Sequence, residues 1–197
     1  MARLKLQMQI SVDGFNPEGG DENAYRDEER DYSLDLLRGA DVILLGRKTA
    51  ADFIPYWDKA AEDPDNSWQE VARHISEARK IVFSSSADHP DWRNSVVETG
   101  DLADAINRLK SENDKDIIVY GGVSFVKSLI RRNLVDEFHL FVSSVALGSG
   151  RSVFSDLDGL LRLQLRKSIG FQSGRVLLHY DLAGPAGGGS IAPAPES

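Results

Sequence analysis

The chain has 197 residues, no cysteine, 41% hydrophobic residues and a formal net charge of −8. This length and composition suit one α/β domain with a sizeable core, while the negative charge argues against a nucleic-acid or anionic-membrane surface. Disulfides and thiolate metal sites are excluded, and no apolar run approaches the roughly 20 residues that span a bilayer. Because a signal-peptide pattern is also absent, we expect a cytoplasmic protein.

The first part of the chain predicts a strand, a long loop and a helix. Apolar and polar side chains alternate over residues 4–10, as in a strand with one buried face. A polar, glycine-containing loop follows Asp13, and loops of this length are often lids or binding segments. The helical pattern of residues 26–38 then stops at Gly39.

Residues 42–45 form an apolar strand that leads directly into the first candidate phosphate site. That site consists of Gly46, Arg47, Lys48 and Thr49. Glycine permits close approach of a ligand, the two cations attract phosphate, and threonine offers a hydroxyl. The spacing is not that of a P-loop, so a solvated basic turn explains these residues about as well.

A second candidate site follows the next predicted strand. An aromatic cluster of Phe53, Tyr56 and Trp57 either lines a pocket or fills the core, and a helix is expected over residues 68–78. The strand of residues 80–83 then ends in Ser84, Ser85 and Ser86. Three hydroxyls at a strand end suit phosphate recognition, although they suit an ordinary turn as well.

The third candidate site is the diglycine at Gly121 and Gly122. It follows the apolar strand of residues 117–120 and precedes helical spacing over residues 123–130, with Ser124 expected to cap the helix. Backbone amides at a helix start favour negative charge, and glycine lets a phosphate approach them. Taken alone, the pair is read more readily as a simple turn.

The remaining segments complete an α/β pattern. We expect a minor strand at 96–98, a helix at 102–109, a strand at 138–145 and an antiparallel hairpin formed by 161–169 and 176–182. One domain is therefore predicted for residues 1–183. The Gly, Pro, Ala and Ser-rich residues 184–197 are expected to form a flexible tail. The four histidines (74, 89, 139 and 179) lack metal-ligand spacing, so no metal site is predicted.

The three candidate sites support one another because ligands of open α/β sheets bind beyond the carboxyl ends of the strands. The sequence also resembles the dihydrofolate reductase-like proteins, and within them the reductase domain of the bacterial riboflavin pathway. The matching segments are SVDGF (11–15), LLGRKT (44–49), PYW (55–57), IVYGGVSF (118–125), LVDEFHL (134–140) and LGSGRSVF (147–154). Their order and spacing cover nearly all of residues 1–183.

The resemblance implies a three-layer sandwich with a central, mostly parallel sheet and a C-terminal antiparallel hairpin. It also implies a homodimer and NADPH lying across the strand ends. The adenosine-side phosphates would be held by Gly46, Arg47, Lys48 and Thr49, and the 2′-phosphate region by Ser84, Ser85 and Ser86. Backbone amides of Gly121, Gly122, Val123 and Ser124 would meet the pyrophosphate, and Gln9 and Ser11 would border the nicotinamide.

We therefore expect an NADPH-dependent reductase of a small heterocycle such as a pterin, a pyrimidine or a related C=N or C=O compound. Phe53, Tyr56 and Trp57 are the candidate substrate-binding residues. Asp31 is the candidate proton donor, since the resembled family carries an acid on its first helix; Asp35 lies one turn later, and both also suit a solvated acidic helix. A non-catalytic NADPH-binding module for sensing or assembly is the alternative.

Overall fold

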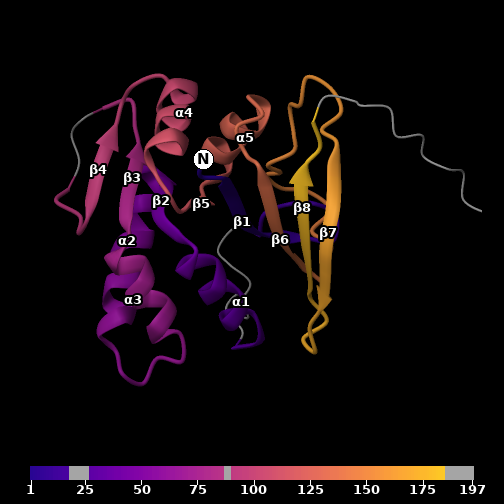
Figure 1. The fold of residues 1–197 in the computed structure, drawn as a ribbon. Coiled ribbons are helices and arrows are strands. Elements are labelled where there is room, and N and C mark those ends of the chain that lie inside the picture. Colours follow the sequence, from indigo (N-terminus) through magenta and orange to yellow (C-terminus); the bar gives the residue numbers. More distant parts are fainter. Residues whose placement is uncertain (18–26, 87–89, 185–197) are drawn as a thin grey trace, which may run out of the picture.

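The computed structural model describes residues 1–17, 27–86 and 90–184, with backbone only for residues 27 and 28 (Figure 1). The tail beyond residue 184 and residues 18–26 of the polar loop lie outside the described residues. The expected α/β fold, with a mostly parallel sheet and a C-terminal antiparallel hairpin, is confirmed. None of the described helices is long and apolar enough to cross a membrane.

The elements follow the order that the sequence predicts. The strands are β1 (Leu4–Ser11), β2 (Ala40–Gly46), β3 (Arg79–Phe83), β4 (Ser95–Glu98), β5 (Asp116–Gly121), β6 (Glu137–Ser143), β7 (Leu163–Gly170) and β8 (Val176–Leu182). The helices are α1 (Asp27–Arg38), α2 (Arg47–Glu62), α3 (Gln69–Glu77), α4 (Leu102–Glu112) and α5 (Val123–Arg131).

All eight strands belong to one sheet, in the order β4-β3-β2-β5-β1-β6-β8-β7. The first six positions in this order pair in parallel, and β8 pairs antiparallel with both β6 and β7. Because parallel strands point the same way, β1, β2, β3, β5 and β6 all end at one edge of the sheet. The three candidate phosphate sites therefore lie along a common edge.

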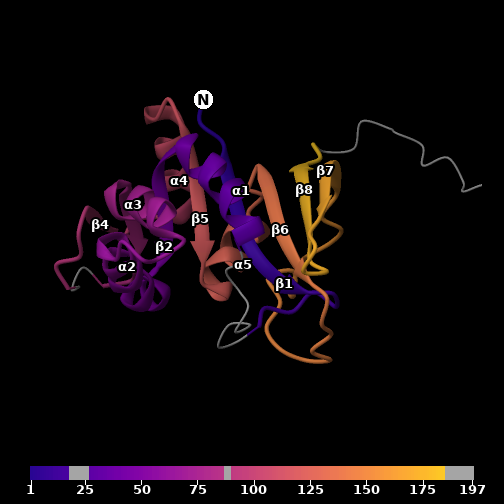
Figure 2. The same cartoon turned by 90° about the horizontal axis from the view of Figure 1, so that it is seen from below.

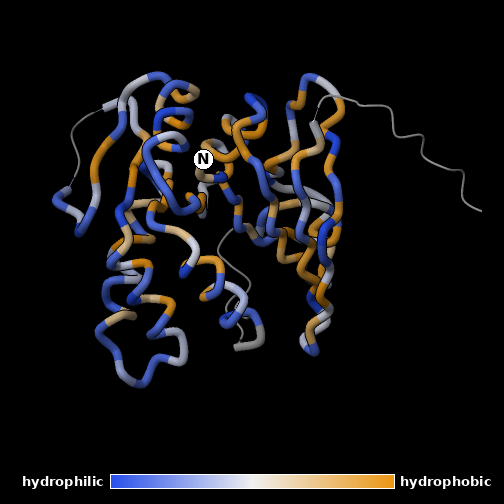
Figure 3. The backbone as a smooth tube through the Cα atoms, viewed as in Figure 1, coloured by the Kyte–Doolittle hydropathy of each residue, from blue (hydrophilic) through white to orange (hydrophobic). Residues whose placement is uncertain are grey.

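Helices cover both faces of the sheet (Figures 1 and 2). On one face, α4 and α5 pack on alternate residues of β1, including Leu4 and Leu6, in a core that also contains Phe138. On the other face, α1, α2 and α3 enclose a second core around Ile43 and Trp57. In Figure 3 hydrophobic stretches recur through the central strands, while polar stretches mark the turns at the periphery.

Helix α5 begins at Val123, one residue before Ser124, its expected cap. The N-cap is Gly122, and no side chain caps the helix, so the prediction that Ser124 caps α5 is wrong. Helix α2 likewise starts after Gly46 without a side-chain cap. Both helices thus present their first backbone amides at the carboxyl edge of the sheet, where they are available to an anion.

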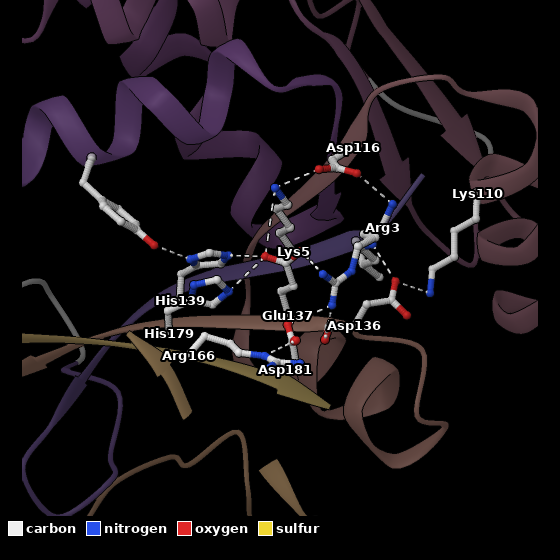
Figure 4. A network of polar contacts seen from close by, with 12 residues as sticks. Arg3, Lys5, Lys110, Asp116, Asp136, Glu137, His139, Arg166, His179 and Asp181 are labelled. Carbon is white, nitrogen blue, oxygen red and sulfur yellow. Dashed lines mark hydrogen bonds and ion pairs between the residues drawn. The ribbon is translucent and has the colours of Figure 1, made fainter. Parts of the chain in front are cut away.

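A partly buried polar network links residues of β1, β5, β6, β7 and β8 (Figure 4). Glu137 forms an ion pair with Arg3 at 2.7 Å, and its other carboxylate oxygen lies 4.0 Å from the Lys5 ammonium. Lys5 pairs with Asp116 at 2.7 Å, and Arg3 with Asp181 at 2.9 Å. Burial opposes ionisation of Glu137, but the hydrogen bond from His139 and the charges of Lys5 and Arg3 outweigh it, so the pKa of Glu137 is lowered.

Candidate functional site

The first two candidate phosphate sites meet at the carboxyl edge. Arg47 opens α2, and its Nη1 lies 3.5 Å from the Ser84 hydroxyl beyond β3. The Ser84 hydroxyl also accepts a hydrogen bond from the Ser86 amide at 3.1 Å. Arg47, Lys48, Ser85 and Ser86 are exposed. The edge thus offers two exposed cations beside three hydroxyl groups.

The third site touches the first. A Cβ placed on Gly122 would lie 2.6 Å from Thr49 Oγ1, closer than side-chain carbons approach other atoms in proteins. Gly121 adopts a φ of +140°, which favours glycine, and the Gly121–Gly122 peptide bond is cis. Glycine at 122 is therefore required for the close approach of the two strand-to-helix junctions.

A cavity of about 240 Å³ opens beside these junctions, on the face of the sheet that α1 and α2 cover. Its polar lining residues are Gln7, Gln9, Asn16, Glu29, Ser33 and Thr49, and its aromatic ones are Phe53, Trp57, Trp68, Tyr120 and Phe141. Gln9, Thr49, Phe53 and Trp57 were predicted from the sequence as site residues. An apolar cavity with a few polar groups is the usual form of a small-molecule site.

Tyr56 lies outside this cavity. It is 53% exposed and lines a neighbouring open hollow of about 540 Å³ with Lys48, Asp52 and residues shared with the cavity. Its ring packs edge-on against Trp57 with 5.2 Å between centroids. In the PYW segment, Trp57 therefore lines both the cavity and the neighbouring hollow, whereas Tyr56 lines only the hollow.

Ser11 and Val123 are not among the residues that line the cavity. The Ser11 side chain is fully buried, and its hydroxyl donates to Asp13 at 2.5 Å and accepts from the Phe15 amide at 2.9 Å. Val123 is 5% exposed and belongs to the core beneath α5. For Val123 only the backbone amide remains as a candidate ligand, in line with the prediction; the Ser11 hydroxyl is already used within its own turn.

Asp13 fixes the glycine-containing loop that follows β6. Its carboxylate accepts hydrogen bonds from the Leu147 and Gly148 amides, the shorter being 2.7 Å. The Ser11 hydroxyl and the Gly148 amide, followed by the Leu147 amide, lower the pKa of Asp13 to about 2. The Asp13 carboxylate thus joins the motifs SVDGF and LGSGRSVF, which lie far apart in sequence, into one clamp.

The carboxylate in the cavity is Glu29 rather than Asp31. Glu29 is 2% exposed and pairs with Arg175 at 2.9 Å, both side chains being almost wholly buried. Asp31, in contrast, is 81% exposed next to Arg30, and Asp35 is 78% exposed. The expected placement of Asp31 in a closed apolar pocket is therefore wrong, because two residues along a helix turn a side chain by about 200°.

The sequence contained a signal for Glu29 in the periodicity of the first helix. Glu29, Ser33 and Leu37 are buried and recur at four-residue intervals, so they share the inner face of α1. Arg175, directly before β8, gave no such signal, because its pairing with Glu29 spans 146 positions. Gln7, also unpredicted, donates to the Ser33 hydroxyl at 2.8 Å across the same cavity.

Comparison with known proteins decides the family. The model of the RibD C-terminal domain matches residues 2–177. The chain belongs to the RibD C-terminal domain family. The uncharacterized protein YyaP of Bacillus subtilis is 31% identical over 180 residues, which cover 90% of this chain and 94% of YyaP.

Solved structures agree with this fold. A Thermotoga maritima diaminohydroxyphosphoribosylaminopyrimidine deaminase/5-amino-6-(5-phosphoribosylamino)uracil reductase matches with a TM-score of 0.66 and 19% identity, over 92% of this chain and 57% of that one. Enterococcus faecalis dihydrofolate reductase, complexed with NADP(H) and RAB-propyl, matches with a TM-score of 0.60 and 12% identity, over 91% of this chain and 95% of that one. This RibD C-terminal domain thus has the dihydrofolate reductase-like fold.

We expect the Asp13 clamp to open in acid. Since the folded pKa of about 2 lies below the ordinary 3.8, the stabilising contribution is present above about pH 4 and is lost as the pH falls toward 2. Hydrogen-exchange protection of the Leu147 and Gly148 amides should fall over this range, and should be low at every pH in Asp13→Ala. Asp101→Ala, which removes a carboxylate that caps α4, is the control and should leave both amides protected. Unchanged protection in Asp13→Ala would contradict the clamp.

We expect Gly122→Ala to destabilise the fold through Thr49. The φ of Gly122 is −82°, which alanine tolerates, so the penalty of about 1–3 kcal/mol would come from the 2.6 Å approach to Thr49 Oγ1. In a Thr49→Ala background the penalty should shrink, and urea unfolding of the four proteins measures this coupling. Gly159→Ala, where a Cβ meets no atom within 4 Å, is the control. Equal penalties in both backgrounds would argue against the contact.

Proposed function

We propose that this RibD C-terminal domain is an NADPH-dependent reductase of a small heterocyclic compound. The observation that carries the proposal is the meeting of two uncapped helix starts, at Gly46 and Gly122, beside exposed Arg47 and a cavity of about 240 Å³. A dinucleotide needs a phosphate-binding edge, and a small substrate needs an enclosed pocket next to it. Both features lie at the same carboxyl edge.

The chain's own residues suit the phosphates of such a cofactor. Backbone amides from Gly122 to Ser124 and from Gly46 to Thr49 favour negative charge at two helix starts. Arg47 and Lys48 add two cations, and Ser84, Ser85 and Ser86 add hydroxyl donors for an extra phosphate. When bound, NADPH supplies the hydride. The protein's part is to place the cofactor, exclude water and handle the proton.

The cavity suits a flat, partly polar substrate. Phe53 packs against Tyr120 with 5.4 Å between ring centroids and against Trp57 at 6.0 Å, so aromatic faces form much of the wall. Gln7, Gln9 and Asn16 add amide groups at the sheet side. Aromatic rings and amides together favour a pterin, a pyrimidine or a related ring with C=N or C=O bonds.

Glu29 is the residue that we propose to orient the substrate and to assist its protonation. Reduction of a C=N or C=O bond requires a proton as well as a hydride, and Glu29 is the acid that lines the cavity. Arg175 supplies a counter-charge at 2.9 Å, which keeps a buried carboxylate tolerable and fixes its orientation. Asp31 is less suited to this role, because its side chain is exposed to solvent and does not line the cavity.

A non-catalytic NADPH-binding module would also use the phosphate edge. The cavity and its buried acid favour an enzyme, since binding alone requires neither. Oxidation of NADPH measured against panels of pterins, pyrimidines and quinones separates the two functions. Assembly as a homodimer and a cytoplasmic location stay predictions.

We expect NADPH to bind more tightly than NADH, and Arg47 to contribute to the difference. Loss of one charge-assisted hydrogen bond to the extra phosphate should weaken NADPH binding by about tenfold in Arg47→Ala, with little change for NADH. Arg73→Ala removes an exposed arginine from α3 and should change neither. Calorimetry with both dinucleotides measures the effect. Equal losses for NADPH and NADH would assign Arg47 to a general or structural role.

We expect Glu29→Gln and Asp31→Asn to behave differently. Both changes replace a carboxylate by the matching amide on α1, but only Glu29 lines the cavity. With a substrate found by the panel, Glu29→Gln should lower kcat by about 100-fold or more and alter its pH dependence, while NADPH affinity stays unchanged. Asp31→Asn should retain turnover. The reverse result would return the role to the exposed acid.

A further inference from the structure

Three potential metal ligands converge beneath α1, apart from the cavity and the phosphate edge. They are Glu137 and His139 on β6 and His179 on β8 (Figure 4). Nε2 of each histidine lies 3.1 Å from the same oxygen of Glu137, Oε2. The spacing of these residues in sequence suggests no metal site. The antiparallel register places His139 directly opposite His179, and Glu137 lies two residues earlier on the same face of β6.

Two of the three distances between the ligand atoms are close to those of a tetrahedral site. Zinc binds imidazole nitrogen and carboxylate oxygen at roughly 2.0–2.1 Å, so neighbouring ligand atoms lie about 3.3 Å apart. Two of the three separations here are 3.1 Å, and all three ligand atoms lie within 4.8 Å of one another. Small rotations of the two stacked imidazole rings, whose centroids are 4.2 Å apart, would admit a cation.

The surrounding side chains hold two of the ligands in place. The Tyr32 hydroxyl lies 2.7 Å from Nδ1 of His139, which leaves Nε2 directed at Glu137. A metal-bound His139 would be the Nδ1–H tautomer and would donate this hydrogen to the Tyr32 oxygen, as partners of metal-binding histidines commonly accept one. Arg3 binds the other oxygen of Glu137 at 2.7 Å and so fixes the carboxylate plane.

The charges around the three ligands and their exposure to solvent set the affinity expected for a metal ion. Glu137 and His139 are buried, whereas the His179 side chain is 21% exposed and gives a route from solvent. The network contains four cations (Arg3, Lys5, Lys110 and Arg166) and four acids (Asp116, Asp136, Glu137 and Asp181). A divalent ion would add charge to this balanced set, with Lys5 4.0 Å from the ligand oxygen. Affinity should therefore be below that of a dedicated structural zinc site.

We propose that Glu137, His139 and His179 form a binding site for a nitrogen-preferring divalent cation of the zinc class. Two imidazoles and one carboxylate favour zinc, cobalt, nickel or copper over magnesium and calcium, which prefer oxygen ligands. The bound ion would join β6 to β8 and so secure the C-terminal hairpin on the sheet. This proposal rests on the geometry of the network and holds whether or not the chain is a reductase.

The test is titration of the untagged full-length chain with zinc chloride by calorimetry, and with cobalt chloride by visible absorption. We expect one ion per chain, cobalt absorption bands of a low-coordinate site, and no saturable binding of magnesium. His179→Ala and Glu137→Gln should each weaken zinc binding at least about tenfold, as should Tyr32→Phe through His139. His74→Ala removes an imidazole from α3, far from the network, and should bind like the parent.

Two further measurements keep the test decisive. Lys5→Met removes the ammonium nearest to the ligand oxygen of Glu137 and should tighten zinc binding. Zinc should also raise the melting temperature of the parent protein but not that of His179→Ala. Circular dichroism verifies that each variant is folded, and His179, the most exposed ligand, is the variant least disturbing to the core. Absence of saturable binding, or equal affinity in the parent, His179→Ala and Glu137→Gln, would overturn the proposal.

Discussion

The parallel pairing of the central strands is the constraint on which the rest of the structure depends. β1, β2, β3, β5 and β6 run the same way, so their carboxyl ends lie at one edge although in sequence they range from Ser11 to Ser143. Two helices start at this edge without side-chain caps. The contact between Thr49 and Gly122 then brings those starts together. The proposed phosphate-binding edge follows from strand direction and glycine placement, with few dedicated side chains.

The face of the sheet beneath α1 carries two different environments in succession. Along β1 and β6, Gln9 pairs with Phe141 at the cavity, and Gln7 pairs with His139 at the border of the charged network. Tyr32 touches both regions, since its hydroxyl meets His139 at 2.7 Å and its ring packs edge-on against Phe141. Burial, with the charge of Glu137, raises the pKa of Tyr32 to about 12, so the phenol keeps its proton at neutral pH. Tyr32 therefore connects the histidine pair to Phe141 in the cavity wall.

The helix that carries the candidate acid was predicted correctly, but the acid chosen on it, Asp31, faces solvent. A resemblance to a family with an acid on its first helix does not show which acid of α1 faces inward. Helical rotation decides which acid faces inward, and burial of Ser33 and Leu37 places Glu29 there. The partner that makes a buried Glu29 tolerable, Arg175, comes from the hairpin at the other end of the chain. No local pattern could have paired them.

The sequence by itself determined the order of strands and helices, the terminal hairpin, and the junctions at Gly46, Ser84 and Gly121, while the mostly parallel sheet was implied by the resemblance to a known family. Hydrophobic periodicity and glycine position are local properties, so they can be read along the chain. The tertiary structure alone decided which side chains meet: Glu29 with Arg175, Asp13 with the Gly148 loop, and Glu137 with two histidines. These contacts depend on strand register and helix rotation, which are fixed only when distant segments pack together, because a shift of one residue turns a side chain to the opposite face.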